Sequence, residues 1–274
     1  MNPAFWTAAR QTRRLAALTG TVVCLSAASA VPLASRNAAA VKRRLGSLVQ
    51  TGSQRRPGDF GSRERRVTDV LLVLNAVVYI AQLASKQRLT AWGIKHNGMI
   101  RAGQWWRLLT PALLHGSTVH LLMNNYSLNS IGPLTERLSG HARFAAVYAA
   151  SAITAVVGSV IMNPQMAVGA SGAIFGVGGA MAVFFYRHRG YFGESSDAIL
   201  RQLGQALAIN TVIGLTTPQV DQWAHFSGLL GGAAVAWALG PRYVQVEQVK
   251  GNLLTLDRPP VPLLAWPSAR DGRR

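Results

Sequence analysis

Polar residues occur at three places inside long apolar stretches of this sequence. His120 and Asn124 lie one helical turn apart in one stretch, Ser171 begins a second, and His225 lies near the start of a third. Polar groups are costly in such segments, which makes them candidates for function. A serine beside a histidine that can take its proton is the arrangement of a nucleophile with its general base. The residue types therefore indicate covalent catalysis by a serine hydroxyl.

Glycines at helical spacing allow the second and third stretches to pack closely together. One glycine face follows Ser171 and another is shared with His225. The residues are Gly172, Gly176, Gly228 and Gly232. Small residues let two helices approach backbone to backbone. We therefore predict that the Ser171 hydroxyl and the His225 ring come within hydrogen-bond reach.

A helix that starts at Ser171 provides a place for a developing negative charge. The first backbone N–H groups of a helix lack intrahelical acceptors, and the positive end of the helix dipole lies beside them. His120 and Asn124 can donate further hydrogen bonds to the same anion. These groups predict an oxyanion site next to the nucleophile.

The composition of the 274 residues favours a membrane protein. Hydrophobic residues make up 49% and charged residues 14% of the chain, whereas about 25% charged residues is usual for a soluble domain. A disordered chain and a coiled coil are excluded. The net charge of +18 has two possible explanations: the protein binds nucleic acid, or the charge lies in a basic tail.

The positive charge is concentrated in residues 1–66. This segment holds 12 Lys and Arg against Asp59 and Glu64, and it is rich in Ala, Ser and Thr. Its apolar part, Leu15–Ala34, is something that a phosphate-binding arm does not need, so we expect no nucleic-acid partner. The composition is typical of an organelle transit peptide, and a retained tail or a seventh span is the alternative. Cys24 is the sole cysteine, which excludes an intramolecular disulfide.

Six apolar runs follow, most of them close to the roughly 20 residues that cross a bilayer. A soluble helical bundle of this size has no need to bury so many. We predict an all-α membrane protein with a six-transmembrane-helix bundle over residues 67–240. The predicted helices are Val67–Ala84, Val119–Leu138, Ala142–Met162, Ser171–Tyr186, Ile199–Leu215 and Trp223–Leu239.

The joints between the runs predict how the bundle is oriented. Basic residues gather at the joints of one side, at Arg137, Arg143, Arg187, Arg189 and Arg201. Such residues favour the side where insertion begins, so both termini are expected to face the cytoplasm or its organellar equivalent. The joint Lys86–Gly116, on the far side, is long and also basic, and such a loop is typically functional. Residues 241–274 are polar and contain prolines, and we expect an extended tail without chemistry.

Several motifs in a fixed order give the sequence a wider resemblance. They are Trp106-Arg107, His115 with His120-Leu121-Leu122-Met123-Asn124, Glu136-Arg137-Leu138-Ser139-Gly140 with Arg143-Phe144, Gly169-Ala170-Ser171-Gly172-Ala173-Ile174-Phe175-Gly176, and Ala224-His225-Phe226-Ser227-Gly228. In these motifs the sequence resembles the rhomboid intramembrane serine proteases over roughly Val67–Gly240. The resemblance implies a six-helix bundle whose long first loop lies half-embedded in one leaflet. It also implies cleavage of a substrate transmembrane helix near its end.

The resemblance further implies a role for single residues. Ser171 is expected to be the nucleophile, and His225 the general base and then the general acid. His120 and Asn124, with the Ser171 amide, are expected to form the oxyanion site. Phe175 is expected to lie against the His225 ring, because the family often has an aromatic residue there.

The residues next to this dyad are expected to support it. Gly172 and Gly228 belong to the helix contact. Asp221, one turn before His225, is either a triad acid that orients the imidazole or a structural residue. We favour the second interpretation, because on one helix its carboxylate reaches the backbone end sooner than the far ring nitrogen. Ser227 stands where the family commonly has Gly, and its hydroxyl can loosen the packing or bond back to a carbonyl.

The hypothesis is an enzyme that cleaves transmembrane protein substrates in the lipid bilayer without a metal or cofactor. A catalytically inactive relative that binds or escorts membrane proteins is the alternative, although such relatives usually lack the Ser or the His. The absence of paired inverted repeats counts against a transporter. Tyr186-Arg187-His188-Arg189 and Asp257-Arg258-Pro259-Pro260 resemble the plastid branch of plant and algal rhomboids. This implies a chloroplast membrane, with the mitochondrial inner membrane as the alternative.

Overall fold

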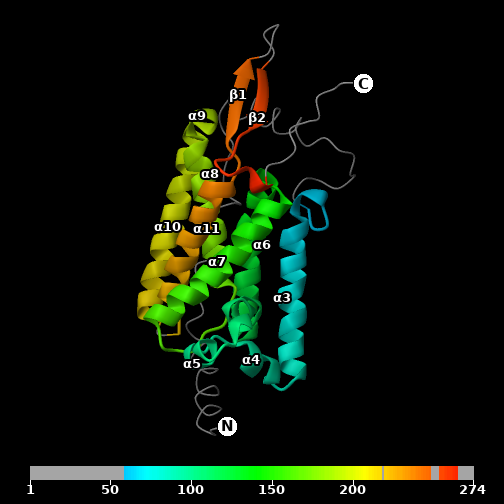
Figure 1. The fold of residues 1–274 in the computed structure, drawn as a ribbon, viewed down its shortest axis with the longest axis vertical. Helices are drawn as coiled ribbons and strands as arrows, with labels where there is room; N and C mark the ends of the chain where they lie inside the picture. The colour runs from blue at the N-terminus through cyan, green and yellow to red at the C-terminus, as the bar shows by residue number, and fades with distance from the viewer. Residues whose placement is uncertain (1–58, 218, 248–252, 265–274) are drawn as a thin grey trace.

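Six long helices make up most of the described chain. The computed structural model describes residues 59–217, 219–247 and 253–264, so Leu15–Ala34, Cys24 and most of the predicted transit peptide lie outside the described residues. The helices are α3 (Arg66–Ala84), α6 (Thr118–Ser139), α7 (His141–Met162), α8 (Ser171–Arg187), α10 (Glu194–Thr216) and α11 (Gln222–Leu239). Each covers one predicted apolar span, so the predicted six-helix bundle is confirmed (Figure 1).

Short polar signals set where the site-bearing helices begin. The Ser117 hydroxyl caps α6 by accepting a hydrogen bond from the His120 N–H at 3.1 Å. The Asp221 carboxylate caps α11 by accepting from the Ala224 N–H at 3.1 Å. His120 and His225 lie in the first turns of these two helices. Side-chain caps of this kind satisfy backbone donors that the helix leaves open, so they fix the first turns that carry both histidines.

The three helices that carry the candidate site are not among those that are long and apolar enough, taken alone, to cross a membrane. The 3-10 helix η2 (Arg63–Arg65) runs directly into α3. Together they form the segment Arg63–Ala84, which is long and apolar enough to cross a membrane, as are α7 and α10. Helix α8 is apolar but shorter, and α6 and α11 contain the polar candidate residues. The chain is a multi-pass membrane protein. Helix α8 contacts α6, α7, α10 and α11, which places it at the centre of the bundle.

Glycines join α8 to α11 backbone to backbone. A Cβ built on Gly228 would lie 2.1 Å from the carbonyl oxygen of Gly172, and one built on Gly232 would lie 2.1 Å from that of Gly176. No larger side chain fits at such distances. The two glycine faces therefore meet, and they bring the start of α8 against the start of α11.

The other side of α11 packs on α7. A Cβ built on Gly158 of α7 would lie 1.8 Å from the Ser227 hydroxyl oxygen, and one built on Gly231 would lie 2.0 Å from that of Thr154. Ser227 therefore occupies space that a glycine leaves open on the facing helix. Its hydroxymethyl group is accommodated in the α7–α11 contact.

The long loop after α3 is folded into short helices. These are α4 (Arg88–Gly93), α5 (Asn97–Arg101), and the 3-10 helices η3 (Trp105–Leu108) and η4 (Thr110–Leu113). Arg107 is 3% exposed, and its guanidinium donates to the carbonyl oxygens of Ala91 and Ile94. Lys95 is fully buried as well. Arg107 thus holds the loop together, and the Lys95 ammonium bonds to carbonyl oxygens outside the loop. These two basic residues of the loop have structural roles and are not orientation signals.

A buried carboxylate closes the opposite end of the bundle. Glu136, near the end of α6, accepts hydrogen bonds from the N–H groups of Val67 and Thr68, both at 2.8 Å, and from the Thr68 hydroxyl at 2.6 Å. A ring nitrogen of His141 lies 2.6 Å from the same carboxylate. The starts of α3 and α7 are thus tied to the end of α6.

A two-stranded hairpin that the sequence analysis did not predict follows α11. Strand β1 (Tyr243–Glu247) pairs antiparallel with β2 (Leu253–Asp257), and Tyr243 lies opposite Asp257. The hairpin stands at the end of the bundle far from α4 and α5 (Figure 1). Asp257 accepts a hydrogen bond from Arg143 at 2.6 Å, and the Arg143 side chain is buried. Two short helices complete the described chain, α9 (Arg189–Phe192) and η5 (Pro262–Leu264).

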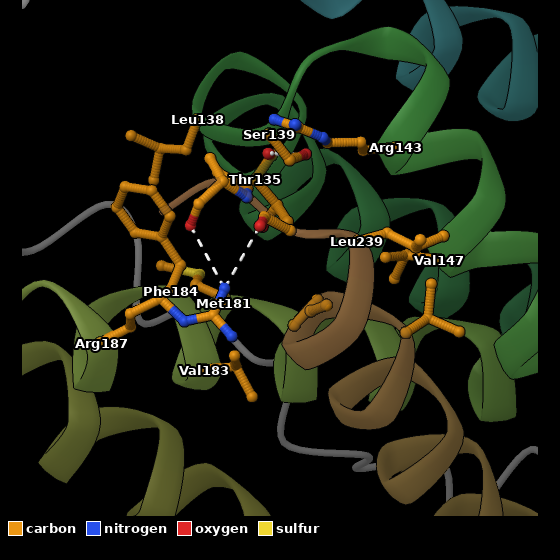
Figure 2. A pocket seen from close by; sticks show the side chains of 15 residues that line it. Thr135, Leu138, Ser139, Arg143, Val147, Met181, Val183, Phe184, Arg187 and Leu239 are labelled. Carbon is orange, nitrogen blue, oxygen red and sulfur yellow. Dashed lines mark hydrogen bonds between the residues drawn. The ribbon is translucent and has the colours of Figure 1, made fainter. Parts of the chain in front are cut away.

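A cavity opens beside the hairpin end, between α6, α7, α8 and α11. Its wall is largely apolar and includes Arg143, Met181 and Phe184. Figure 2 shows Arg187 lying across it, where the guanidinium donates to the carbonyl oxygens of Gly240 and Pro241. None of the residues that the sequence analysis assigned to the oxyanion site or the dyad lines this cavity.

Candidate active site

Ser171 and His225 lie in hydrogen-bond contact. Ser171 is the first residue of α8, and His225 lies in the first turn of α11. Nε2 of His225 is 2.8 Å from the Ser171 hydroxyl oxygen. The His225 residue is 9% exposed, whereas Ser171 keeps more of its surface open. A hydroxyl in this position can act as a nucleophile while the imidazole takes its proton.

Phe175 covers one face of the His225 ring. The two rings stack with their centroids 4.2 Å apart and an angle of 9° between their planes. Phe175 lies one turn after Ser171, so α8 carries both the hydroxyl and the ring that packs on its partner. This stacking holds the imidazole plane in the orientation in which Nε2 meets the hydroxyl.

Asp221 is bonded away from the imidazole. One carboxylate oxygen accepts from the Ala224 N–H at 3.1 Å, and the other accepts from the Ser159 hydroxyl on α7. The second ring nitrogen of His225, Nδ1, is buried and has no hydrogen-bond partner among the residues that the structure describes. The carboxylate thus caps α11 and ties it to α7, and it does not contact the ring nitrogen that a triad acid would bind.

A buried amide donor stands open close to Ser171. Nδ2 of Asn124, a residue that is 6% exposed, finds no partner in the described part of the chain. Buried donors are usually satisfied, so an open one requires an explanation. A Cβ built on Gly169 would lie 2.7 Å from Cε1 of His120 and 3.7 Å from Nδ2 of Asn124. Both side chains therefore face Gly169, which precedes Ser171 by two residues.

The His120 ring presents an N–H group to this small polar site. The Gly116 N–H donates to Nδ1 of His120 in a long hydrogen bond of 3.5 Å. A neutral ring that accepts at Nδ1 carries its proton on Nε2, and Nε2 is 2.8 Å from the Cβ built on Gly169. The neighbouring His115 adds no positive charge, because burial lowers its pKa to about 3. His120 and Asn124 thus offer two donors beside Gly169, two residues before Ser171.

The arrangement contains the parts for acyl transfer: a hydroxyl, a base in contact with it, and donors that converge on one side. Within residues 59–217, 219–247 and 253–264, no three His, Cys, Asp or Glu side chains gather to hold a metal ion.

A comparison of the sequence with protein families identifies the family of this chain. Residues 102–242, just over half of the chain, match the family model described as the Rhomboid domain. The chain belongs to the rhomboid family. The rhomboid match contains His120, Asn124, Ser171 and His225, whereas the β-hairpin lies beyond its end.

Three relatives show how far the similarity of this rhomboid extends. Rhomboid protease GluP of Bacillus subtilis (strain 168) is 39% identical over 158 residues, which cover 56% of this chain and 30% of GluP. YdcA of the same organism is 33% identical over 171 residues, which cover 61% of this chain and 84% of YdcA. RHOMBOID-like protein 4 of Arabidopsis thaliana is 31% identical over 166 residues, which cover 59% of this chain and 41% of the plant protein. The chain thus spans less than half of GluP, and the plastid-type branch stays a prediction.

Three residues at or near the rhomboid site have roles that the sequence analysis did not assign to them. Gly169 has a φ of +136°, and a Cβ built on it would lie 2.7 Å from Cε1 of His120. The motif that contains it does not reveal this conformation. Ser159 is one hydroxyl in an apolar run and bonds to Asp221 from 62 residues away. Lys95 looked like one basic residue among several in its loop, but it contacts the segment before α8.

Proposed function

We propose that this rhomboid is an intramembrane serine endopeptidase that hydrolyses a peptide bond near the end of a transmembrane segment of its substrate. The observation that carries the proposal is the 2.8 Å contact between Nε2 of His225 and the Ser171 hydroxyl. The name of the relative GluP, a rhomboid protease, supports the same activity. The proposed reaction uses no metal and no cofactor.

The reaction begins with the transfer of a proton. Ser171 gives its hydroxyl proton to Nε2 of neutral His225 while Oγ attacks the carbonyl carbon of the scissile peptide bond. The imidazolium then protonates the leaving nitrogen, the C–N bond breaks, and an acyl-enzyme remains. Water gives a proton to the same Nε2 as it attacks the acyl carbon. The bond to Ser171 breaks, and the serine recovers its proton from the imidazolium.

The negative charge that forms on the carbonyl oxygen requires donors already in place. Nδ2–H of Asn124, Nε2–H of His120 and the Ser171 N–H supply them in this proposal. The open Asn124 amide supports this role, because an acceptor that forms only during the reaction explains an otherwise unsatisfied donor. Removing one such donor in serine proteases costs about 100-fold to 1,000-fold in kcat.

The neighbouring residues support the dyad in this proposal. Phe175 fixes the imidazole plane by stacking, and Gly172 and Gly228 allow the close contact of α8 with α11. Asp221 acts as the cap of α11 and does not take part in proton transfer.

Transmembrane segments of proteins in the same bilayer are the proposed substrates. Ser171 lies at the end of a helix inside a membrane-spanning bundle, so a peptide bond must approach from the membrane or its surface. The basic joints at the other end of the bundle indicate that this end faces the cytoplasm or its organellar equivalent. The active site then lies toward the opposite face.

A serine-directed fluorophosphonate probe tests the proposal. The full chain in detergent is expected to become labelled, and Ser171→Ala is expected to abolish the label. In proteoliposomes the wild type is expected to cleave a model transmembrane substrate, and Ser171→Ala is not. A wild type that neither labels nor cleaves, but retains bound membrane proteins, would identify the inactive escort instead.

The basic, acid-poor segment before residue 59 supports a location in a plastid membrane, with the mitochondrial inner membrane as the alternative. The full chain with a fluorescent protein at its C-terminus is expected to colocalise with chlorophyll in plant cells. Colocalisation with a mitochondrial dye would select the alternative, and fluorescence in neither organelle would reject organelle targeting.

A further inference from the structure

A buried lysine of the long loop binds the segment that leads into Ser171. Lys95 lies between α4 and α5 and is 0% exposed. Its ammonium donates to the carbonyl oxygens of Asn163 and Gln165, both at 2.6 Å. Its backbone N–H donates to the carbonyl oxygen of Ala167 at 3.1 Å, which forms an antiparallel bridge. One residue thus binds the segment between α7 and α8 at three alternate positions.

The surroundings of Lys95 are suited to a positive charge. Asn163 is the C-terminal cap of α7, and the last carbonyl groups of a helix lack intrahelical donors and carry the negative end of the helix dipole. Burial lowers the pKa of Lys95, and the charge of Asp221 acts in the opposite direction. The ammonium therefore donates hydrogen bonds at the end of α7, where carbonyl oxygens would otherwise be buried without donors.

Asn97 supports the same end of α7 from the same loop. Its amide donates to the carbonyl oxygens of Val160 and Asn163, both at 3.1 Å. These bonds end at Asn163. The bonds of Lys95, in contrast, continue along the segment to Gln165 and Ala167.

Two residues beyond Ala167, the same segment enters the active site. The Gly169 N–H donates to the carbonyl oxygen of Pro111 at 2.9 Å, and Gly169 is the residue that His120 and Asn124 face. Lys95 and Pro111 both belong to the long loop, so this loop sets where Gly169 lies. The position of Gly169 in turn sets the distance between the start of α8 and the donors on α6.

We propose that Lys95 is a positioning residue, which holds the segment between α7 and α8 so that the Ser171 end of α8 faces the donors of α6. Its action runs through the backbone of this segment and not through the reacting atoms. The kinetic consequence rests on the proposed protease function, whereas the anchoring of the segment does not.

Hydrogen–deuterium exchange of the full chain in detergent tests the anchoring. Lys95→Met removes the ammonium and keeps most of the side-chain volume, and Lys86→Met makes the same change at an exposed lysine of the same loop. Amides of residues 163–170 are expected to exchange about tenfold faster in Lys95→Met, because local opening becomes easier. Lys86→Met is expected to leave them unchanged. Wild-type exchange of this segment in Lys95→Met would overturn the proposal, whatever the activity of the protein.

Kinetics test the consequence for the active site. With kcat expressed per fluorophosphonate-titrated site, Lys95→Met is expected to lower kcat by about tenfold to 100-fold, since small misplacements of reacting groups have effects of this size. The KM value and Lys86→Met are expected to stay at wild-type values. A wild-type kcat per titrated site would overturn the positioning role. If the wild type has no Ser171-dependent turnover, the proposed function fails, and the exchange result alone decides the role of Lys95.

Lys95→Gln provides a second variant in case Lys95→Met does not fold. Its shorter neutral amide can still donate to one of the two carbonyl oxygens, so faster exchange at residues 163–170 is expected, with a smaller change than in Lys95→Met. A folded Lys95→Gln whose exchange and kcat per titrated site both equal those of the wild type would contradict the proposal.

Discussion

The two ends of the bundle both bury a histidine, but they leave it with different hydrogen bonds. At the hairpin end, Nδ1 of His188 lies 2.8 Å from the Phe184 carbonyl oxygen, and Nε2 accepts from the Tyr243 N–H at 3.1 Å. Burial lowers the pKa of this ring, which agrees with a neutral tautomer protonated at Nδ1. At the other end, His225 contacts the Ser171 hydroxyl through Nε2, and Nδ1 has no partner among the described residues. A ring bonded on both sides is fixed in one state, whereas a ring bonded to one hydroxyl is able to exchange a proton with it.

Two other polar residues repeat this difference. The Glu136 carboxylate is fully buried and accepts three hydrogen bonds from Val67 and Thr68. The Asn124 amide is nearly as buried, but its Nδ2 donors are open in the described part of the chain. The bonds of His188 and Glu136 stabilise the fold at the hairpin end, whereas the open groups of His225 and Asn124 at the Ser171 end are available to a substrate.

The same substitution at both histidines tests this comparison most strongly. His225→Gln removes the proposed base and is expected to lower kcat by at least about 1,000-fold, as loss of a member of a serine-protease dyad or triad does. His188→Gln is expected to lower the melting temperature and to leave kcat per fluorophosphonate-titrated site unchanged. Cleavage of a model transmembrane substrate and thermal unfolding measure the two effects. Equal losses of kcat in both variants would remove the distinction between the two ends.

A pair of glycine substitutions tests whether the shape of the proposed oxyanion site matters beyond backbone strain. Gly169 has a φ of +136° and no room beside His120, whereas Gly103 has a φ of +94° and nothing within 4 Å of an added Cβ. Gly169→Ala is expected to displace the His120 ring and to lower kcat by about 100-fold, the loss typical of one oxyanion donor. Gly103→Ala carries the strain without the collision and is expected to keep kcat. A normal kcat in Gly169→Ala would show that His120 is not needed where the structure places it.

Much of the fold and of the candidate site could be predicted from the sequence, because the signals involved are local. The six helices follow from runs of apolar residues, and His120 and Asn124 share a face because they are four residues apart. The glycines after Ser171 and His225 predicted the contact between α8 and α11 for the same reason. The distance from Nε2 of His225 to the Ser171 hydroxyl is a consequence of that contact.

The contacts that escaped prediction join residues far apart in the chain. Lys95 bonds to Gln165 across 70 residues, and Arg143 bonds to Asp257 across 114. Neither Lys95 nor Arg143 belongs to a periodic sequence pattern from which its partner could be predicted. The hairpin was missed for a related reason: its strands are only five residues long, and its anchor lies on α7. Buried charges of this kind are recognised only after the fold is known.

A carboxylate at the hairpin end provides the stability counterpart to these kinetic tests. Glu136→Gln keeps the shape but removes the charge and part of the accepting capacity, so the free energy of unfolding is expected to fall by about 2 kcal/mol. Glu194→Gln, at an exposed position of α10, is the control and is expected to change little. Denaturant unfolding and kcat per titrated site measure stability and activity separately. A lower kcat per site in Glu136→Gln would connect the two ends of the bundle, contrary to the comparison.

Asp221 shares features with both ends of the bundle: it is bonded like the hairpin-end residues, but it lies near His225. Asp221→Asn is expected to have the smallest effect on activity. Both oxygens of its carboxylate accept a hydrogen bond, from the Ala224 N–H and from the Ser159 hydroxyl. In this it resembles Glu136, although it lies one turn from His225. Asn is as good a helix cap as Asp and keeps the start of α11 in place, so Asp221→Asn is expected to lower kcat by less than about tenfold. Asp221→Ala loses the cap, and its melting temperature is expected to fall. A loss of kcat in Asp221→Asn as large as that in His225→Gln would mean that the carboxylate acts on Nδ1 during the reaction, and the open nitrogen of His225 would then mark the place of a third catalytic group.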